Sequence, residues 1–318
     1  MRRLLVLCLL LATFALGYCA LAQDDMSKVE IKVQKVVDGV YMLQGAGGNI
    51  GVSAGEDGIV IIDDEFAPLA PKIQAALKGI EDKPVRFVIN THYHGDHTGG
   101  NAEFARGGST VIAQENVRKR LAEGSTISAM KRTTPPAPKE ALPIITFNDR
   151  ATVHLNGEDI RAIHFPNGHT DGDAVIFFPK ANVVHMGDDF VTYGFPFVDV
   201  ENGGSVSGMI AGDEKVLSMV PADAKFIPGH GNLCTADDVR KFIALLKDTR
   251  AIVAADVKKG MTAAQMKEKK VLDAYDKQYG QGFIKTNDWI DALYDDVTHS
   301  KEGAHYHNHG HANEKPGN

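Results

Sequence analysis

The chain of 318 residues is poor in cysteine, in basic runs and in long hydrophobic stretches. It has three cysteines, and cleavage after Ala22 would leave only Cys234, which excludes an internal disulfide in the mature chain. Beyond its start, no stretch is long and apolar enough to span a bilayer. The net charge is -7 without an extended basic run, which argues against nucleic acid as a partner. The composition, 43% hydrophobic and 24% charged, is that of a globular protein with a full core.

The N-terminal residues form a separate segment. A basic pair is followed by an apolar run at 4–16 and by a small-x-small cleavage site that ends at Ala22. This pattern predicts that residues 1–22 are a secretory signal peptide and that the mature protein is periplasmic or secreted. The alternative, a lipoprotein modified at Cys19, is disfavoured because Tyr18 is a poor residue before a modified cysteine.

A histidine-rich loop follows the apolar, strand-like run 85–89 and precedes a Gly-Gly pair. His92 and His94 are two positions apart, so an extended backbone points both to the same side. Asp96 and His97 follow within one turn and can reach a second metal. Zinc binds both imidazole nitrogen and carboxylate oxygen. The spacing therefore predicts a metal-binding loop and disfavours a polar loop of hydrogen-bonded histidines.

Two metals that keep a position open for water need about six or seven protein ligands, and this loop supplies only four. Three further candidates lie downstream: His169, Asp188 and His230. Each follows a strand-like apolar run and lies in a turn that contains glycine.

These four blocks, in this order and spacing, resemble the metallo-β-lactamase fold superfamily over about residues 30–235. The resemblance implies a four-layer αββα sandwich, whereas the alternation of strands and helices alone supports only a mixed α/β (α+β) fold. It also implies two Zn²⁺ ions per chain. The first would be held by His92, His94 and His169, the second by Asp96, His97 and His230, with Asp188 bridging the two.

The resemblance implies a dinuclear zinc hydrolase that cleaves an ester, thioester, lactone or (β-)lactam bond of a small molecule. A hydroxide that bridges the metals would attack the carbonyl carbon, and Asp96 would orient it and shuttle a proton. The β-lactamases of the superfamily carry Cys or Ser where Asp188 stands, and Asp is typical of thioesterases of the glyoxalase II type and of lactonases. The glyoxalase II block around the last histidine is not matched by Pro228-Gly229-His230-Gly231-Asn232. The bond type and the oligomeric state therefore stay open.

Two other functions are weighed against hydrolysis. One is a mononuclear iron dioxygenase of the same fold. The other is a periplasmic metal-handling protein, which is suggested by the histidine-rich tail at residues 301–318. This tail is expected to be disordered, and it either binds metal loosely or is only a spacer.

The remaining chain, 23–300, is expected to form one domain with C-terminal helices. The expected strands are 29–37, 40–44, 49–54, 59–63, 85–89, 110–113, 144–147, 151–155, 160–165, 174–178, 183–186 and 225–227. The expected helices are 68–78, a helix that starts at 101, 116–123, 206–219, 235–259, 262–275 and 288–297. The proline-rich segment 124–143 is expected to be a loop that either overhangs the site or is a plain connection.

Several side chains near the expected site have undecided roles. Asp63 or Asp64 either accepts a hydrogen bond from a metal-binding histidine or caps a helix. Structural or supporting roles, without metal binding, are expected for His154, His164, His185 and Cys234. A place in the pocket wall or in ordinary packing is expected for Tyr193, Phe195 and Phe197.

Overall fold

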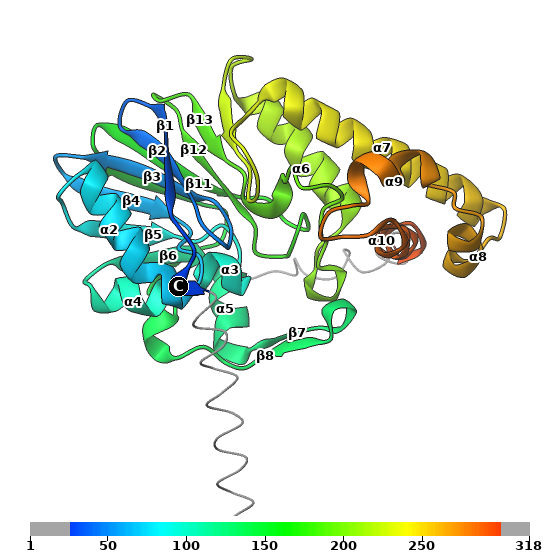
Figure 1. Ribbon diagram of the computed structural model, residues 1–318, viewed down its shortest axis with the longest axis horizontal. Coiled ribbons are helices and arrows are strands. Elements are labelled where there is room, and N and C mark those ends of the chain that lie inside the picture. The colour runs from blue at the N-terminus through cyan, green and yellow to red at the C-terminus, as the bar shows by residue number, and fades with distance from the viewer. Residues whose placement is uncertain (1–25, 300–318) are drawn as a thin grey trace, which may run out of the picture.

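The computed structural model describes residues 26–299, and it is a sandwich of two facing sheets with helices on both outer sides (Figure 1). The expected αββα architecture is confirmed. The predicted signal peptide and the histidine-rich tail lie outside the described residues. Within the described range, no helix has the length and the hydrophobicity needed to cross a bilayer.

The first sheet has seven strands in the order β1-β2-β3-β4-β5-β6-β9. Its strands are β1 (Lys32–Val37), β2 (Val40–Gln44), β3 (Ile50–Gly55), β4 (Gly58–Ile62), β5 (Val85–Ile89), β6 (Thr110–Gln114) and β9 (Ile145–Phe147). The strands β1 to β4 form an antiparallel meander, and β4, β5, β6 and β9 are parallel neighbours.

The second sheet has six strands in the order β10 to β15. Its strands are β10 (Arg150–Leu155), β11 (Glu158–His164), β12 (Ala174–Phe178), β13 (Val183–His185), β14 (Lys225–Ile227) and β15 (Cys234–Thr235). All neighbours are antiparallel except the pair β13 and β14. Each sheet is therefore built from one continuous part of the chain, the first before residue 148 and the second after it.

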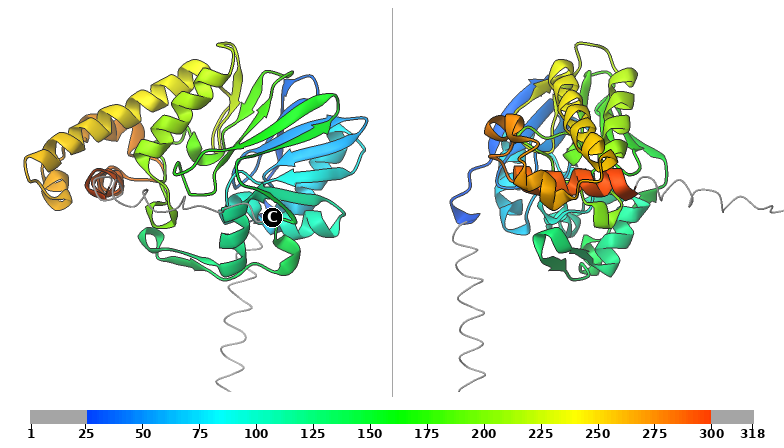
Figure 2. Two further views of the ribbon diagram at one scale, coloured as in Figure 1. Left: turned by 180° about the vertical axis from the view of Figure 1, so that it is seen from behind. Right: turned by 90° about the vertical axis from the view of Figure 1, so that its right-hand side faces the viewer.

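Helices cover the outer face of each sheet, and α8, α9 and α10 gather at the far end of α7, away from α2 (Figure 2). The helices are α2 (Ala70–Ile80), α3 (Gly95–Thr98), α4 (Asn101–Arg106), α5 (Glu115–Glu123), α6 (Val206–Met219), α7 (Ala236–Lys258), α8 (Ala263–Glu268), α9 (Asp273–Tyr279) and α10 (Thr286–His299). Short 3-10 turns are η1 (Ala67–Leu69), η2 (Ser128–Met130), η3 (Lys139–Ala141), η4 (Gly187–Asp189) and η5 (Val200–Asn202).

Strand β4 shows why the central strands are apolar throughout. Its side chains alternate, so Ile59 and Ile61 pack against α2 while Val60 and Ile62 pack against the second sheet. All four are fully buried, and each contributes roughly 1.5–3 kcal/mol to stability. A strand with a layer on both faces therefore needs an unbroken apolar run.

The outer face of the second sheet shares one core with α6, α7 and α10. Trp289 in α10 is fully buried and stacks on Phe195, with ring centroids 5.5 Å apart. Its indole Nε1 donates a hydrogen bond to the hydroxyl of Thr249 in α7, at 3.1 Å. Residue Phe195 belongs to the loop after η4, so this stack ties the C-terminal helix to a loop that reaches the site.

Two expectations for secondary structure were wrong in part. Segment 124–143 contains a hairpin, β7 (Ser125–Ile127) and β8 (Arg132–Thr134), because its β-branched residues pair before the prolines begin. The helix expected at 262–275 is split into α8 and α9, since Lys270 takes a left-handed conformation that a continuous helix does not allow. The other expected elements are present with slightly shifted ends.

Candidate metal centre

Four of the predicted ligands come from the end of β5. His92 and His94 lie in the loop that follows this strand, and His94 has the extended backbone of a helix N-cap. Asp96 and His97 lie in the short helix α3 that begins immediately afterwards. The strand is fixed between β4 and β6, so the loop projects its donors from one end of the sandwich.

The other three predicted ligands come from the second sheet. His169 lies between β11 and β12, Asp188 lies in η4 after β13, and His230 follows β14. Strands β11, β13 and β14 run in the same direction, so their carboxyl ends meet at one edge. All seven side chains predicted from the sequence meet here, in groups whose donor atoms lie within 4.8 Å of one another.

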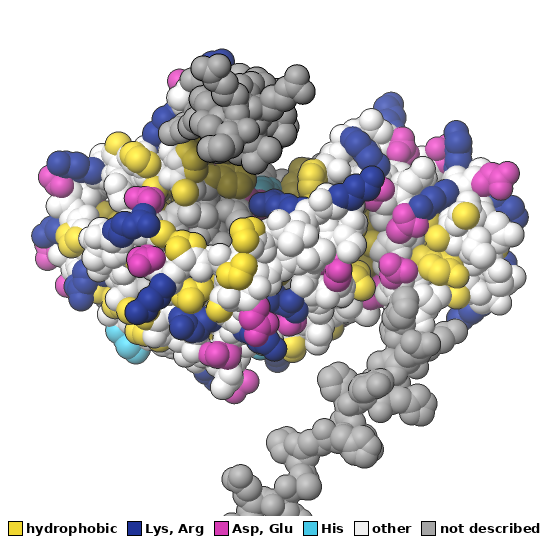
Figure 3. Space-filling model, turned by 90° about the horizontal axis from the view of Figure 1, so that it is seen from below, with side chains coloured by type: hydrophobic (Ala, Val, Ile, Leu, Met, Phe, Trp, Pro, Cys, Tyr) yellow, Lys and Arg dark blue, Asp and Glu magenta, His cyan; other side chains and the backbone are white. Residues whose placement is uncertain are grey.

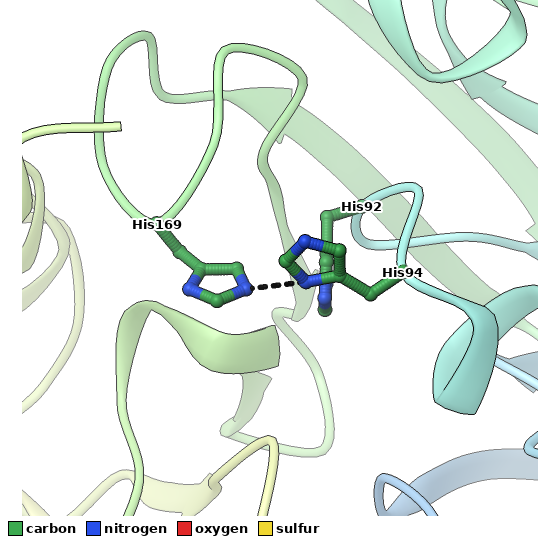
Figure 4. A group of neighbouring side chains, drawn as sticks. All are labelled: His92, His94 and His169. Atoms are coloured by element: carbon green, nitrogen blue, oxygen red, sulfur yellow. Dashed lines mark hydrogen bonds between the residues drawn. The ribbon is translucent and has the colours of Figure 1, made fainter. Parts of the chain in front are cut away.

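The first group joins His94 and His169 to His92 (Figure 4). The His169 Nε2 and His94 Nδ1 atoms are 2.8 Å apart. Their outer nitrogens are already engaged, because His169 Nδ1 donates to the Phe197 carbonyl at 2.8 Å and His94 Nε2 lies 3.0 Å from the Asp199 carboxylate. In these tautomers both inner nitrogens present lone pairs, which repel unless a cation lies between them.

His92 is oriented in the same way. The Thr91 hydroxyl donates to the Asp63 carboxylate at 2.7 Å, so it can accept from His92 Nδ1, which is 3.0 Å away. The opposite nitrogen, His92 Nε2, is buried without a hydrogen-bond partner among the described residues. A buried acceptor without a partner is costly, and a metal ion is a fitting partner for it.

The second group consists of Asp96, His97 and His230. The Nε2 atom of His230 is 3.2 Å from Asp96 Oδ2 and 3.3 Å from His97 Nε2. Asp188 lies between the two groups, since its Oδ1 is 3.2 Å from His97 Nε2 and its Oδ2 is 3.7 Å from His169 Nε2. This is the position that a bridging carboxylate requires.

The electrostatics of the two groups differ. Burial lowers the pKa of His92 well below its usual range and that of His169 to about 4, and neighbouring imidazoles add to this effect. Both rings are thus neutral, as metal ligands must be. In the second group, burial disfavours the protonated, charged form of His230. The nearby Asp188 carboxylate outweighs this effect and raises the pKa of His230 to about 9. The carboxylates of this group therefore attract positive charge.

A carboxylate behind the centre orients His97. Asp63 is fully buried, and its Oδ2 is 2.8 Å from His97 Nδ1. It also accepts hydrogen bonds from the backbone N–H and the hydroxyl of Thr91, each at 2.7 Å. Asp64 instead accepts the backbone N–H of Gly100 at 2.8 Å. The structure thus selects Asp63 as the partner of a metal-site histidine.

Sequence reasoning missed a second carboxylate of this kind. Asp199 is nearly fully buried, and it accepts hydrogen bonds from the hydroxyl of Tyr93 and the side-chain amide of Asn202 as well as contacting His94. More than a hundred positions separate it from His94, and no local motif marks it. Only the packing of η5 against the loop after β5 brings it to the site.

A cavity of about 780 Å³ opens onto Asp96, Asp188 and His230. Tyr193 and Phe197 line it, whereas Phe195 is buried against α10 instead. The hairpin β7–β8 and the prolines after it form another wall, so segment 124–143 overhangs the centre. Figure 3 shows the hollow, with hydrophobic side chains around it and a histidine and a basic side chain within it.

The side chains expected to play other roles lie outside the candidate metal groups of the described residues. His185 is fully buried, and its Nε2 is 2.9 Å from the Asn49 carbonyl. Cys234 is only half-buried, and its thiol donates to the Asn232 carbonyl at 3.1 Å. Burial raises the pKa of this thiol to about 11, so it is not a thiolate at neutral pH. His154 and His164 contact, respectively, the Asp159 carboxylate and the Asp173 carbonyl.

The chain resembles several known proteins. It is 26% identical to the 2,4-dinitroanisole O-demethylase subunit alpha of Nocardioides sp. over 140 residues, 43% of this chain and 40% of that protein. It is 27% identical to the hydroxyacylglutathione hydrolase of Pelagibacter ubique over 121 residues, 37% of this chain and 42% of that enzyme. The matches span less than half the length of these relatives.

Two solved structures share the fold. A metallo-beta-lactamase from Pontibacter korlensis aligns with a TM-score of 0.57 and 18% identity, over 69% of this chain and 99% of that one. The DIM-1 metallo-beta-lactamase aligns with a TM-score of 0.56 and 16% identity, over 70% of this chain and all of that one. The family model of the metallo-beta-lactamase superfamily matches residues 45–234, which is more than half of the sequence. The chain therefore belongs to the metallo-β-lactamase superfamily.

Proposed function

We propose that the protein is a zinc-dependent hydrolase of an ester, thioester, lactone or lactam bond. One observation carries this proposal: seven imidazole and carboxylate donors meet beside a cavity, with Asp188 in contact with histidines of both groups. Residues His92, His94 and His169 would hold one ion, and Asp96, His97 and His230 a second. Zinc bound by such donors lowers the pKa of a coordinated water to about 7 and polarises a carbonyl group.

The fit of the donors to zinc rests on their outer hydrogen bonds. In the first group the outer nitrogens contact a hydroxyl, a carboxylate or a carbonyl, which leaves the inner nitrogens free to bind metal. His97 is fixed in the same sense by Asp63. A donor set of imidazoles and carboxylates suits zinc better than a soft metal such as Cu(I), which prefers sulfur ligands.

Asp96 is suited to orient the attacking water. Its carboxylate faces the cavity and is partly exposed, unlike Asp188. Burial raises the pKa of Asp96, but the nearby His97 and a hydrogen bond from His230 outweigh it and keep the pKa well below its usual range. Asp96 is therefore ionised at neutral pH, and it can orient a water by accepting a hydrogen bond from it.

The relatives support a substrate with a polar scissile bond beside an organic group. One is named for cleaving a hydroxyacylglutathione and another for demethylating 2,4-dinitroanisole. The cavity wall is largely apolar, from Phe66, Leu121 and Phe283. We therefore include a hydroxyacylglutathione, an aryl lactone, a chromogenic cephalosporin and 2,4-dinitroanisole in the set of test substrates.

The proposal is tested by metal content and turnover of the purified chain. We expect two zinc ions per chain and hydrolysis of at least one substrate, and we expect Asp96→Ala to lower kcat at least about 100-fold. A matched control is Asp82→Ala, which removes a carboxylate that is largely exposed on the surface. One iron per chain and no hydrolysis would overturn the proposal and favour an iron dioxygenase. Deletion of residues 304–318 should leave the turnover of a hydrolase intact, and a loss of function on this deletion would favour metal handling.

A further inference from the structure

Three arginines line the cavity, and two of them are already paired. Arg106 forms an ion pair with Glu103. Arg120 binds both carboxylate oxygens of Asp171, at 2.7 and 2.6 Å. Arg132, in β8, has an exposed side chain for which the described part of the chain supplies neither an ion pair nor a side-chain hydrogen bond.

The unpaired guanidinium lies next to the candidate metal centre. A Cβ atom placed on Gly95 would lie 3.4 Å from Arg132 Nη2, and Gly95 stands between His94 and Asp96. A cation beside a site built for two metal ions is repelled by them. With both ions bound such a placement is unfavourable, and it becomes favourable when an anion lies between the guanidinium and the metals.

The hairpin that carries Arg132 is held in place by its own contacts. Glu201 accepts hydrogen bonds from the backbone N–H of Ser128 at 2.6 Å and from its hydroxyl at 3.0 Å. The side-chain amide of Asn202 donates to the Thr126 carbonyl at 3.0 Å. These bonds tie β7 and the turn to η5, so Arg132 is presented from an anchored element.

We infer that Arg132 binds a carboxylate of the substrate, and that the substrate is an apolar carboxylic acid whose scissile bond lies a few ångströms from that carboxylate. This inference rests on the proposed hydrolase function and names its substrate class. The planar guanidinium offers two parallel N–H donors, which match the two oxygens of a carboxylate.

The side chains around Arg132 in the cavity wall indicate what the rest of the substrate is like. The hydrophobic side chains nearest to it in sequence, Ile127 and Met130, belong to the same hairpin and face the cavity. The cavity is also lined by Phe283 and by Phe197, which lies beside the His94 ring with centroids 5.9 Å apart. The cavity has a volume of about 780 Å³ and apolar walls, and Arg132 is the one cation of its lining without a partner among residues 26–299. It suits an aromatic or branched aliphatic body with a single negative charge.

The test compares an acid with its neutral ester. The substrates are the mono-phenyl thioester of succinic acid and the methyl ester of the same compound, and release of thiophenol is measured with the zinc-loaded full chain. Arg132→Gln should raise KM for the acid roughly 10- to 100-fold, because a charge-assisted bidentate contact is lost. It should change kcat and the methyl-ester reaction less than about threefold. Arg132→Lys should restore part of the affinity.

The control is Lys131→Gln, which removes the same charge from the adjacent residue of the hairpin, outside the cavity lining. It should leave both reactions unchanged. Equal losses for acid and ester in Arg132→Gln, or no loss for either, would overturn the inference. Equal losses for the acid in both variants would assign the effect to general charge and would overturn it too.

A binding measurement separates this inference from the proposed function. Calorimetry with 4-phenylbutyrate and with 4-phenylbutanol needs no turnover. If the wild type hydrolyses none of the test substrates, the two thioesters included, but binds the acid at least about tenfold more tightly than Arg132→Gln does, the hydrolase proposal fails and the carboxylate site stands. If acid binding is the same in the two proteins, the carboxylate site fails whatever the turnover.

Discussion

Replacing Asp63 by asparagine should weaken metal binding at one group of donors without removing a ligand. If the new amide directs its oxygen to the Thr91 N–H, its NH₂ replaces the oxygen that lay 2.8 Å from His97 Nδ1. The amide then donates to Nδ1, and the proton of His97 moves to Nε2, which faces Asp188 at 3.2 Å. His97 in that tautomer has no lone pair for a metal.

The opposite amide orientation is also unfavourable. It preserves the contact with His97 but places the NH₂ group where Asp63 Oδ1 now lies, 2.7 Å from the backbone nitrogen of Thr91. Two opposed donors in a buried site cost about 1–3 kcal/mol. Both orientations therefore penalise the metal-ready form, and the loss of such an outer partner typically lowers metal affinity roughly 10- to 100-fold.

The assay is a chelator competition that follows zinc per chain. We expect Asp63→Asn to lose one of two ions at roughly 10- to 100-fold lower chelator activity than wild type, with the other retained. Asp64→Asn is the matched control, because in the described part of the chain the side chain of this buried neighbour accepts a hydrogen bond from the Gly100 N–H alone, and an amide oxygen can do the same. If Asp63→Asn holds both ions as tightly as Asp64→Asn does, the tautomer argument is refuted.

Three other changes test the fold and the hairpin. Trp289→Ala should lower the free energy of unfolding by about 3–5 kcal/mol in a urea titration, because it empties a fully buried site, and a loss below about 1 kcal/mol would contradict the shared core. Asp213 is buried, neither of its carboxyl oxygens has a hydrogen-bond partner within residues 26–299, and burial raises its pKa well above the usual range. Above about pH 4 the unfolded chain releases this proton and the folded chain keeps it, so wild-type stability should fall by about 1.4 kcal/mol per pH unit relative to Asp213→Asn until the folded-state pKa is reached. A pH-independent difference between the two unfolding curves would refute this. Glu201→Gln should speed hydrogen exchange in β7–β8 at least about fivefold, because the charge-assisted bonds to Ser128 are weakened; unchanged exchange would show that other contacts hold the hairpin.

The seven donors were predictable because their signals are local. Each follows an apolar run that becomes a buried strand, and strand ends that share a direction meet at one edge of a sheet. The roles of these donors as ligands stay a prediction until metal is measured. The αββα layers needed the family resemblance, since alternation of strands and helices is compatible with other mixed folds.

Residues whose roles depend on long-range packing were not predictable. Asp199 reaches His94 from the segment directly before η5, and Phe283 reaches the cavity from the segment between α9 and α10, where its neighbour Ile284 pairs with Phe195. The place of Arg132 in the cavity wall was not predicted, because the prolines that follow it led us to expect a loop where two strands pair. Asp63 is an intermediate case: the sequence narrowed the choice to it and its neighbour Asp64, and only the distance to His97 decided between them.

The division of the sandwich into two consecutive halves has a consequence for assembly. Every candidate donor group takes members from before and after the exposed link Asn148–Asp149. Neither half alone carries a complete set, so tight metal binding would report that the two sheets have docked in register. If the chain were cut at this link, the two fragments would regain metal affinity only by associating correctly. Metal affinity would therefore measure the correct reassembly of the two halves.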